Sequence, residues 1–348
     1  MLVLFAAGPE RSMADTAWQA AACARALVAW DYTELLDMAE PIALHVGLAT
    51  SEDLWSVHVG GVHNRWEFLL TGGALTTELS AALEHAGRGQ VACSKATARL
   101  LGSNAQLDAS DRGACHVLHA VAWPAAAAGA ARQPCSGSAV VRQYCQRYIP
   151  AYALPFLEAG VALGELRRCT VAFINLLTPD VSTDSGLAAF QRTVAALQEE
   201  TFKALGEVRQ IITDDKGTVA IVVFGLQATA KAAYLGLRAL DRISQRLAAV
   251  GSGLPPATGV TTSDCVFFGA IGSHERCEAA VVGQAVNMAA RICGKCGPGL
   301  HCDEATRQAA AALALERRDL TFEPLPPITV KGRDEPMPIS RVSAPAGS

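Results

Sequence analysis

The sequence has little charge of either sign, few aromatic side chains and no long apolar run. Charged residues make up 18% of the 348 residues, aromatic residues 6%, and the formal net charge is -4. This weakly acidic balance argues against a basic surface for nucleic acid and against a highly charged, disordered tail. Hydrophobic residues reach 51%, which is ample material for buried cores. We therefore expect a globular protein with no nucleic-acid partner.

No stretch matches a membrane span, because a transmembrane helix needs roughly 20 apolar residues. The small-residue stretch Val121–Ala131 is shorter than that and contains Pro124. The opening M-L-V-L-F-A-A-G-P has no basic residue ahead of its apolar run, which ends at Gly8 and Pro9, so it does not resemble a secretory signal. We interpret it as a β-strand and expect a cytoplasmic protein without a membrane span.

The cysteines do not form a metal-binding pattern. There are 11 of them, and they are scattered singly along the chain. The one close pair, Cys293 and Cys296 in C-G-K-C, lacks the second pair that a structural zinc site needs. Reduced thiols in a cytoplasmic protein are the simpler interpretation.

Two distant parts of the chain resemble each other. H-V-G-L-A-T-S-E at 45–52 and A-T-G-V-T-T-S-D at 257–264 are both strand-like around a central glycine. Each is followed by a short apolar segment, at 57–61 and 266–270, which we interpret as the partner strand of a hairpin. Each copy then has a second glycine that opens a helix, within F-L-L-T-G-G-A-L-T-T-E-L and A-A-V-V-G-Q-A-V-N-M-A-A. A repeat of this length predicts two copies of one domain.

The boundary between the copies is predicted from composition. Ala125–Ser138 consists mostly of small residues with glycines and Pro134, which is typical of a linker. We therefore predict a first domain at 1–124, a linker region at 125–168 and a second domain at 169–348. The chain length suits two domains of ordinary size.

The second copy has the pattern of an α+β sandwich. T-V-A-F-I-N-L-L at Thr170–Leu177 predicts a core strand, and a helix is expected from about Ser185 to Leu205. Two β-branched runs within Arg209–Gly225 are joined by D-D-K-G, which predicts a hairpin. Strand, helix, hairpin, helix, hairpin, helix is the order of a ferredoxin-like fold. In the first copy M-L-V-L-F-A-A aligns with the second half of that hairpin, so we expect this copy to be incomplete.

Asn287 and Arg291 are the strongest candidates for a functional site. They stand four residues apart in the otherwise apolar run E-A-A-V-V-G-Q-A-V-N-M-A-A-R-I-C. Because one helical turn takes 3.6 residues, both side chains project from the same face and can reach the same ligand atoms. In the alternative interpretation Arg291 caps the helix C-terminus and Asn287 is a buried polar residue with local partners.

The motif V-G-Q-x-V-N-x-A-A-R resembles the nucleotide-site helix of class III nucleotidyl cyclases. The closest pattern is that of the soluble adenylyl cyclases, which have tandem catalytic domains; V-R-Q-Y-C-Q-R-Y-I-P resembles their inter-domain segment. The resemblance implies two ferredoxin-like domains that form an intramolecular pseudo-dimer with ATP between them. It also implies conversion of ATP to 3′,5′-cyclic AMP and pyrophosphate for intracellular signalling.

The resemblance also assigns site residues. Arg291 would hold the α-phosphate, Asn287 would orient the ribose, and both would be catalytic. Lys331 lies in P-I-T-V-K-G-R-D-E-P-M-P-I, which resembles the closing hairpin of cyclase domains, and would contact the triphosphate. In isolation it would be interpreted as an exposed edge-strand lysine. Gln210 and Val281 are also expected to be nucleotide-binding residues.

Base recognition follows only from the overall similarity. The matching base-contact positions hold Gln210, whose amide can still bond a purine edge, and Ala280, which cannot. Neither matches the pair that guanylyl cyclases use. The arginine that binds bicarbonate in the soluble enzymes aligns with Leu79, so bicarbonate regulation is not supported.

The metal ligands of such enzymes are not expected in this sequence. Two divalent ions, Mg²⁺ or Mn²⁺, are held in the family by two aspartates of the complementary domain. In the first copy both positions would lie before Met1, and the second copy has Asn175 and Gly217 there. Asp214 and Asp215 are nearby and are interpreted as a solvated hairpin tip. The expected metal-binding residues of this chain are therefore none.

Two other functions are compatible with these residues. A catalytically inactive pseudo-cyclase would bind nucleotide, or a partner cyclase, as a regulatory module; Asn175, Gly217, Gln210 and Ala280 favour it. A plain ferredoxin-like scaffold protein is the third possibility, and it leaves the spacing of Asn287 and Arg291 without a reason.

Overall fold

The computed structural model of the chain describes residues 3–30, 43–108, 115–122, 139–155, 164–176, 180–214, 217–227, 229–250, 253–272, 277–330 and 335–345. It divides into two compact units. The first comprises Met1–Trp55 and Thr71–Ser136, and the second comprises Ser56–Leu70 and Gly137–Ser348. Ala125–Ser138, the small-residue stretch of the predicted linker region, lies outside the described residues. The predicted domain boundaries stay a prediction.

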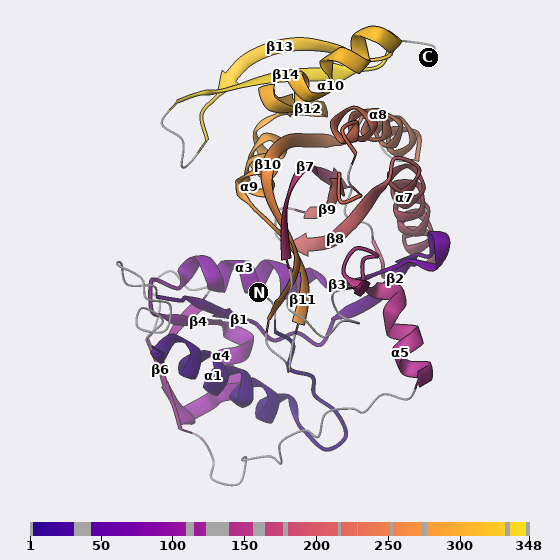
Figure 1. Cartoon of the computed structure of the whole chain (residues 1–348). Helices are drawn as coiled ribbons and strands as arrows, with labels where there is room; N and C mark the ends of the chain where they lie inside the picture. Colours follow the sequence, from indigo (N-terminus) through magenta and orange to yellow (C-terminus); the bar gives the residue numbers. More distant parts are fainter. Residues whose placement is uncertain are drawn as a thin grey trace. The chain divides into compact units, whose positions relative to one another are not determined.

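The second unit is built around one large sheet, drawn from magenta to yellow in Figure 1. Its strands lie in the order β13-β14-β12-β10-β7-β9-β8, and β11 pairs with β10. The first part of this unit's sheet and its helices are β7 Gly164–Leu176, α7 Asp184–Lys203, β8 Gly206–Asp214, β9 Gly217–Phe224, α8 Ala232–Val250 and β10 Ala257–Gly272. The second part is β11 Cys277–Val282, α9 Gln284–Lys295, β12 Gly299–Asp303, α10 Glu304–Arg317, β13 Thr321–Ile328 and β14 Met337–Ser343.

The first part of this sheet is a ferredoxin-like core. β7 lies between β10 and β9, β8 is the outer neighbour of β9, and all three pairings are antiparallel. α7 connects β7 to β8, and α8 connects β9 to β10. This is the connectivity of the split βαβ fold, so the predicted α+β class is confirmed. The predicted strand, helix and hairpin of the second copy are confirmed as β7, α7 and β8–β9.

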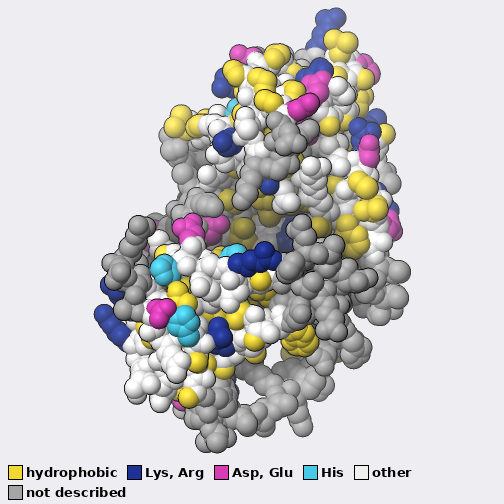
Figure 2. Space-filling view, turned by 90° about the vertical axis from the view of Figure 1, so that its left-hand side faces the viewer, with side chains coloured by type: hydrophobic (Ala, Val, Ile, Leu, Met, Phe, Trp, Pro, Cys, Tyr) yellow, Lys and Arg dark blue, Asp and Glu magenta, His cyan; other side chains and the backbone are white. Residues whose placement is uncertain are grey.

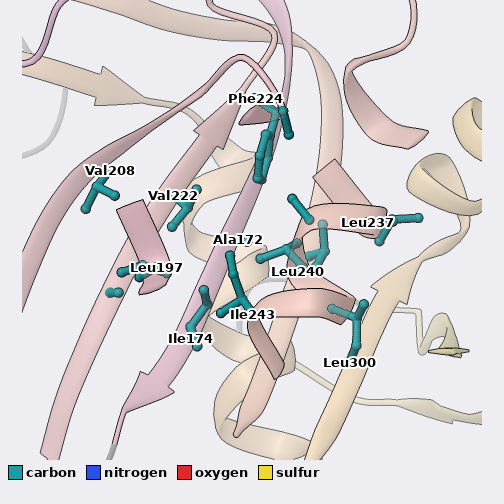
Figure 3. Close-up of a cluster of buried hydrophobic side chains, with 14 of the residues drawn as sticks. Ala172, Ile174, Leu197, Val208, Val222, Phe224, Leu237, Leu240, Ile243 and Leu300 are labelled. Atoms are coloured by element: carbon teal, nitrogen blue, oxygen red, sulfur yellow. The ribbon is translucent and has the colours of Figure 1, made fainter. Parts of the chain in front are cut away.

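Helices cover both faces of the sheet, with α7 and α8 on one side and α9 on the other (Figure 1). Figure 3 shows side chains from β7, β8, β9, α7, α8 and β12 converging in the largest cluster of buried hydrophobic residues in this unit. Phe224, Leu237 and Ile174 are fully buried there. Because each such side chain contributes about 1.5–3 kcal/mol when fully buried, this cluster is the main source of stability. A second cluster packs α9 against Val171, Val223 and Phe268, and a third packs other residues of α9 against Met337 and Ile339 of β14.

The first unit repeats the second half of this sheet. Its elements are α1 Met13–Ala29, β1 Val46–Leu48, α3 Gly73–His85, β4 Val91–Ser94, α4 Lys95–Leu101, β5 Ala105–Asp108 and β6 Cys115–Val121. Its strand order β1-β4-β6-β5 matches β10-β12-β14-β13 of the second unit. The first pair is parallel and the other two are antiparallel in both units. The internal repeat predicted from sequence is therefore confirmed.

A glycine in the first strand of each copy lets a helix lie close to it. A Cβ on Gly47 would be 2.6 Å from the backbone nitrogen of Leu83 in α3. A Cβ on Gly259 would collide with the Ala289 carbonyl oxygen and the Cys293 amide nitrogen of α9. Any side chain at either position would therefore push the helix away from the sheet. The central glycines noticed in the sequence repeat have this packing role.

The predicted pairing of the first hairpin in each copy is wrong. In the second unit, 257–264 and 266–270 are not two partner strands but one strand, β10, with a register shift between Ser263 and Val266. The bulge lets the strand continue, and the chain reverses only after Gly272, so the hairpin partner is β11. In the first copy β2 Trp55–Gly60 likewise pairs with β3 Trp66–Thr71.

The prediction of a strand at the start of the chain is also wrong. Residues 3–7 are described and are not part of a strand. The segment aligns with β9, which lies between β7 and β8 in the second unit. The described part of the first unit has no counterpart of β7 or β8, so this backbone has no neighbouring strand with which to pair.

Two glutamines of α7 hold the β2–β3 hairpin, whose residues Ser56–Leu70 belong to the second unit. Gln191 accepts a hydrogen bond from the Gly60 amide at 2.9 Å and donates to the Gly60 carbonyl at 2.7 Å. Gln198 accepts from the Val62 amide at 3.2 Å and donates to the Arg65 carbonyl at 3.1 Å. The two glutamines are seven residues apart and therefore lie on the same helical face.

Replacing Gln198 by leucine is expected to destabilise the second unit by about 2–4 kcal/mol. The Gln198 side chain is fully buried, and the change leaves the Val62 amide without a partner, at about 1–3 kcal/mol. It also removes one of the two hydrogen bonds that the Arg65 carbonyl accepts, at about 0.5–1.5 kcal/mol, while the bond from the Gly61 amide remains. Chemical denaturation measures the loss. Gln245→Leu is the matched control, because Gln245 is exposed on α8 and bonds the Asp241 side chain. An equal effect of the two substitutions would contradict the role of Gln198 in holding the hairpin on α7.

Candidate nucleotide-binding site

The helix α9 carries both strongest candidates outside its buried stripe. Its buried residues are Ala285, Met288, Ala289, Ile292 and Cys293, which recur at the spacing of one helical face. Asn287 is exposed and Arg291 is half-buried. The sheet therefore fixes the helix through one face, and both polar side chains stand beside that face, one turn apart.

The alternative interpretation of these two residues does not match their positions. Asn287 is not buried, so it is not a core amide with local partners. Arg291 precedes the last turn of α9, which ends at Lys295 and has Cys296 as its C-cap. A cation that offsets the helix dipole acts within the last turn. Both residues are therefore polar groups beside the buried stripe of α9, and their predicted roles stay predictions.

The sheet places Gln210 on the same side as α9. Gln210 is half-buried on β8 and lies opposite Ile221 of β9. Directly opposite residues share a sheet face, and Ile221 belongs to the cluster that packs against α9. A register shift between Val208 and Gln210 sets this orientation. Gln210 thus lies on the sheet face that α9 covers, and its predicted contact with the base stays a prediction.

Val281 and Ala280 differ from Gln210 because they are buried. Val281 is 5% exposed on β11, lies opposite Phe268 and packs in the cluster under α9. Ala280 is 6% exposed. The side chain of Val281 is therefore part of the core, and the group that it can offer a ligand is its backbone.

The buried cysteine of α9 anchors the helix next to Asn175. The Cys293 thiol donates to the Ala257 carbonyl at 3.3 Å and lies against the backbones of Gly259 and Asn175. Burial raises the pKa of Cys293 to about 11. A thiol with so high a pKa stays protonated and unreactive near neutral pH, so its role is packing.

The second unit's own residues do not fit a two-metal site. Asn175 is exposed near the end of β7, and Gly217 begins β9 directly after the hairpin turn. The resemblance would place two carboxylates at these positions to hold hard divalent cations, and the residues present are an amide and a glycine. In the described ranges, no group of three or more His, Cys, Asp or Glu is arranged to hold a metal ion. No step of the chemistry is therefore assigned to a metal held by this unit.

A large cavity lies elsewhere in the second unit. It has a volume of about 550 Å³ and is lined by the first half of α7, the end of α8 and the segment Leu254–Ala257. Asn175 borders it, but Asn287, Arg291 and Gln210 do not. The cavity is therefore distinct from the candidate site on α9.

Lys331 lies outside the described residues, and its predicted role stays a prediction.

Sequence reasoning missed the glutamine clamp, by which Gln191 and Gln198 of α7 hold the β2–β3 hairpin. Gln191 and Gln198 are ordinary polar residues of an amphipathic helix when α7 is considered alone. Their partners, Gly60, Val62 and Arg65, lie more than a hundred positions earlier in the chain, and no local pattern connects them. The spacing of the two glutamines on one helical face was the available signal.

The surface is mixed in charge, as the composition suggests. Figure 2 shows acidic and basic side chains interspersed with hydrophobic ones on the visible face of the second unit, rather than gathered by sign.

Within the part of the chain that the structure describes, no helix has both the length and the apolar character to cross a bilayer.

Comparison with family models gave no match. Among curated proteins, the chain is 28% identical over 200 residues to "Uncharacterized protein Rv1320c" of Mycobacterium tuberculosis and to "Uncharacterized protein Mb1354c" of Mycobacterium bovis. The match covers 53% of this chain and 33% of each relative. The chain thus spans about a third of the length of these relatives.

Solved structures similar to this chain include nucleotidyl cyclases. They include the adenylyl cyclase CyaB from P. aeruginosa (15% identity, TM-score 0.45, covering 53% of this chain and 97% of that one). A bacterial light-regulated adenylyl cyclase has 17% identity and a TM-score of 0.46, covering 58% and 60%. The guanylate cyclase domain of RhGC from Catenaria anguillulae, in complex with GTP, has 18% identity and a TM-score of 0.43, covering 53% and 99%. Both adenylyl and guanylyl cyclases occur among them.

Proposed function

We propose that this chain contains the tandem catalytic domains of a class III nucleotidyl cyclase and binds ATP for conversion to 3′,5′-cyclic AMP and pyrophosphate. The observation that carries the proposal is the arrangement on α9, where Asn287 and Arg291 stand one turn apart beside a buried stripe. The matching sequence motif and the ferredoxin-like order of the second unit support it.

The chemistry of cyclisation suits these two groups. The ribose 3′ oxygen attacks the α-phosphorus in line with the departing pyrophosphate, and negative charge accumulates on the phosphate oxygens. The fixed donors of the Arg291 guanidinium would hold the α-phosphate and neutralise that charge. The Asn287 amide would hold the ribose so that its 3′ oxygen is aimed at phosphorus. Lys331 is proposed to contact the triphosphate as a mobile point charge.

The proposed choice of adenine depends on Gln210. Its amide offers one acceptor and two donors, which can pair with the donor and acceptor on one edge of adenine. Gln210 is also on the sheet face that α9 covers. Ala280 has no polar side-chain atom, so the base would be held by fewer hydrogen bonds than in a site with two polar residues. We therefore propose ATP as substrate, with modest discrimination against GTP.

A second candidate function is favoured by Asn175 and Gly217. Without carboxylates at these positions the second unit does not hold catalytic metals, and a nucleotide-binding pseudo-cyclase would not need them. Such a module would use the α9 face to bind nucleotide and would act by regulating a partner. The two proposals share the binding site and differ in the chemical step.

Assays of binding and product on the same purified chain separate these functions. We expect ATP to bind with measurable affinity, and cyclic AMP to form from ATP in the presence of manganese at a low rate. Calorimetry measures the binding, and chromatography of the nucleotides measures the product. Binding without product over a long incubation would support the regulatory module instead. Absence of both would contradict the cyclase and the module alike.

A further inference from the structure

Glu67 lies at the junction of the β2–β3 hairpin, α7 and β8, where it completes the hydrogen-bond network of Gln198. Its Oε1 atom accepts a hydrogen bond from Gln198 Nε2 at 3.2 Å. The Oε1 atom of the same glutamine accepts from the Val62 amide. Gln198 is fully buried, and Glu67 is half-buried. The Gln198 side-chain amide that holds the hairpin on α7 therefore also donates a hydrogen bond to the Glu67 carboxyl group.

Glu67 has a second carboxyl group nearby. Glu207 on β8 acts on Glu67 as a like charge, which disfavours its ionised form. Arg65 donates through Nη1 to the backbone carbonyls of Ile149, at 2.6 Å, and Gln146, at 3.4 Å, and acts on Glu207. A small cavity of about 30 Å³ collects the titratable and charged groups of the junction, which are Arg65, Glu67, Arg147, Tyr148, Glu207 and Arg209.

These surroundings move the titration of Glu67 towards neutral pH. Burial, with a smaller contribution from Glu207, raises the pKa of Glu67 to about 7, and the hydrogen bond from Gln198 opposes the rise. Burial also raises the pKa of Glu207, which Arg65 partly offsets. A neutral carboxyl avoids both the desolvation of a charge and the repulsion from Glu207. The docked hairpin therefore favours protonated Glu67.

We propose that Glu67 acts as a proton-controlled latch, which holds the β2–β3 hairpin on α7 when it is neutral and loosens the hairpin when it ionises. The latch would respond to pH without involving a nucleotide, so it goes beyond the proposed function and stands independently of it. Its elements are the carboxyl of Glu67, the opposing carboxylate of Glu207 and the amide of Gln198.

The direction of the effect follows from proton binding. The docked state binds the proton more tightly than the released state, in which Glu67 returns to its ordinary pKa of 4.5. Stabilisation of the docked hairpin is complete below that ordinary value and is lost as the pH rises through about 7. Between pH 6 and pH 8 these two pKa values predict that the docking equilibrium weakens about tenfold.

Hydrogen exchange of the full chain tests the latch at single amides. The Gly60 amide donates to Gln191 and the Val62 amide to Gln198, so both are protected only while the hairpin is docked. After correction for the intrinsic pH dependence of exchange, we expect their protection factors to fall about tenfold from pH 6 to pH 8. The amides of β9 in the same unit serve as the internal control and should not show this dependence.

Two variants identify the responsible group. Glu67→Gln keeps the shape of a neutral carboxyl and should remove the pH dependence, with protection at pH 8 equal to that at pH 6. Glu207→Gln should keep the hairpin docked and shift the loss of protection to lower pH, because the like charge is gone. A flat wild-type profile would overturn the proposal. So would a Glu67→Gln variant with an unchanged pH dependence; if that variant did not fold, an unshifted Glu207→Gln profile would do the same.

Discussion

Replacing Gly259 by valine is expected to destabilise the second unit by about 3 kcal/mol and to abolish nucleotide binding. The new Cβ would meet backbone atoms of α9 at Ala289 and Cys293, which cannot rotate away as a side chain could. The helix must therefore move off the sheet, and overpacking of this kind typically costs about 1–3 kcal/mol. Because α9 carries Asn287 and Arg291, the movement also displaces the proposed ligand groups. Chemical denaturation and ATP titration measure the two effects.

Gly294 supplies the control for this substitution. It lies in the last turn of the same helix, and a Cβ there has no heavy atom within 4 Å. Gly294→Ala should leave ATP binding unchanged and change stability by no more than about 1 kcal/mol, in the stabilising direction, because alanine favours helix. Tolerance of valine at Gly259 without loss of stability would show that α9 is not held as closely as described.

Replacing Arg291 by alanine is expected to reduce ATP affinity of this chain by roughly 10- to 100-fold. A charge-assisted hydrogen bond contributes about 1.5–3 kcal/mol, and the guanidinium is proposed to offer the α-phosphate more than one donor. In a catalytically active form the turnover should fall further, by up to about a thousandfold, because the charge on the phosphate grows in the transition state. Calorimetric titration measures the affinity, and product formation at saturating ATP measures turnover.

The matched control is Lys295→Ala on the same helix. Lys295 is exposed in the last turn of α9, so its removal takes away one positive charge without touching the proposed site. ATP affinity should stay within about twofold, since an exposed charge at the surface is screened by salt. An equal loss in the two variants would mean that Arg291 acts by net charge alone and not by holding the phosphate.

The second unit was predictable where local patterns determine structure. The apolar spacing in α9 and the D-D-K-G turn between β8 and β9 are short-range signals, and both elements form as predicted. The strand–helix–hairpin order then leaves few ways to pair four strands, of which the ferredoxin-like order is one. The placement of Asn287 and Arg291 beside the buried stripe follows from the same periodicity.

Features that depend on distant partners were not predictable in this way. β10 continues through Ser263 and Val266 because it pairs with β7 on both sides of the register shift. In the sequence alone, the residues between the two apolar segments resembled a hairpin turn. The opening segment is strand-like in composition, but among the described residues of the first unit no strand pairs with it. The clamp of Gln191 and Gln198 joins parts of the chain that no local pattern connects. Long-range pairing overrides local preference in each case.

The most direct test of the central claim is a crystal structure of this chain with a non-hydrolysable ATP analogue. The account predicts the α-phosphate at hydrogen-bond distance, about 2.7–2.9 Å, from the Arg291 guanidinium, with the Asn287 amide on the ribose. An analogue bound with its phosphates away from α9 would contradict the assignment of the site.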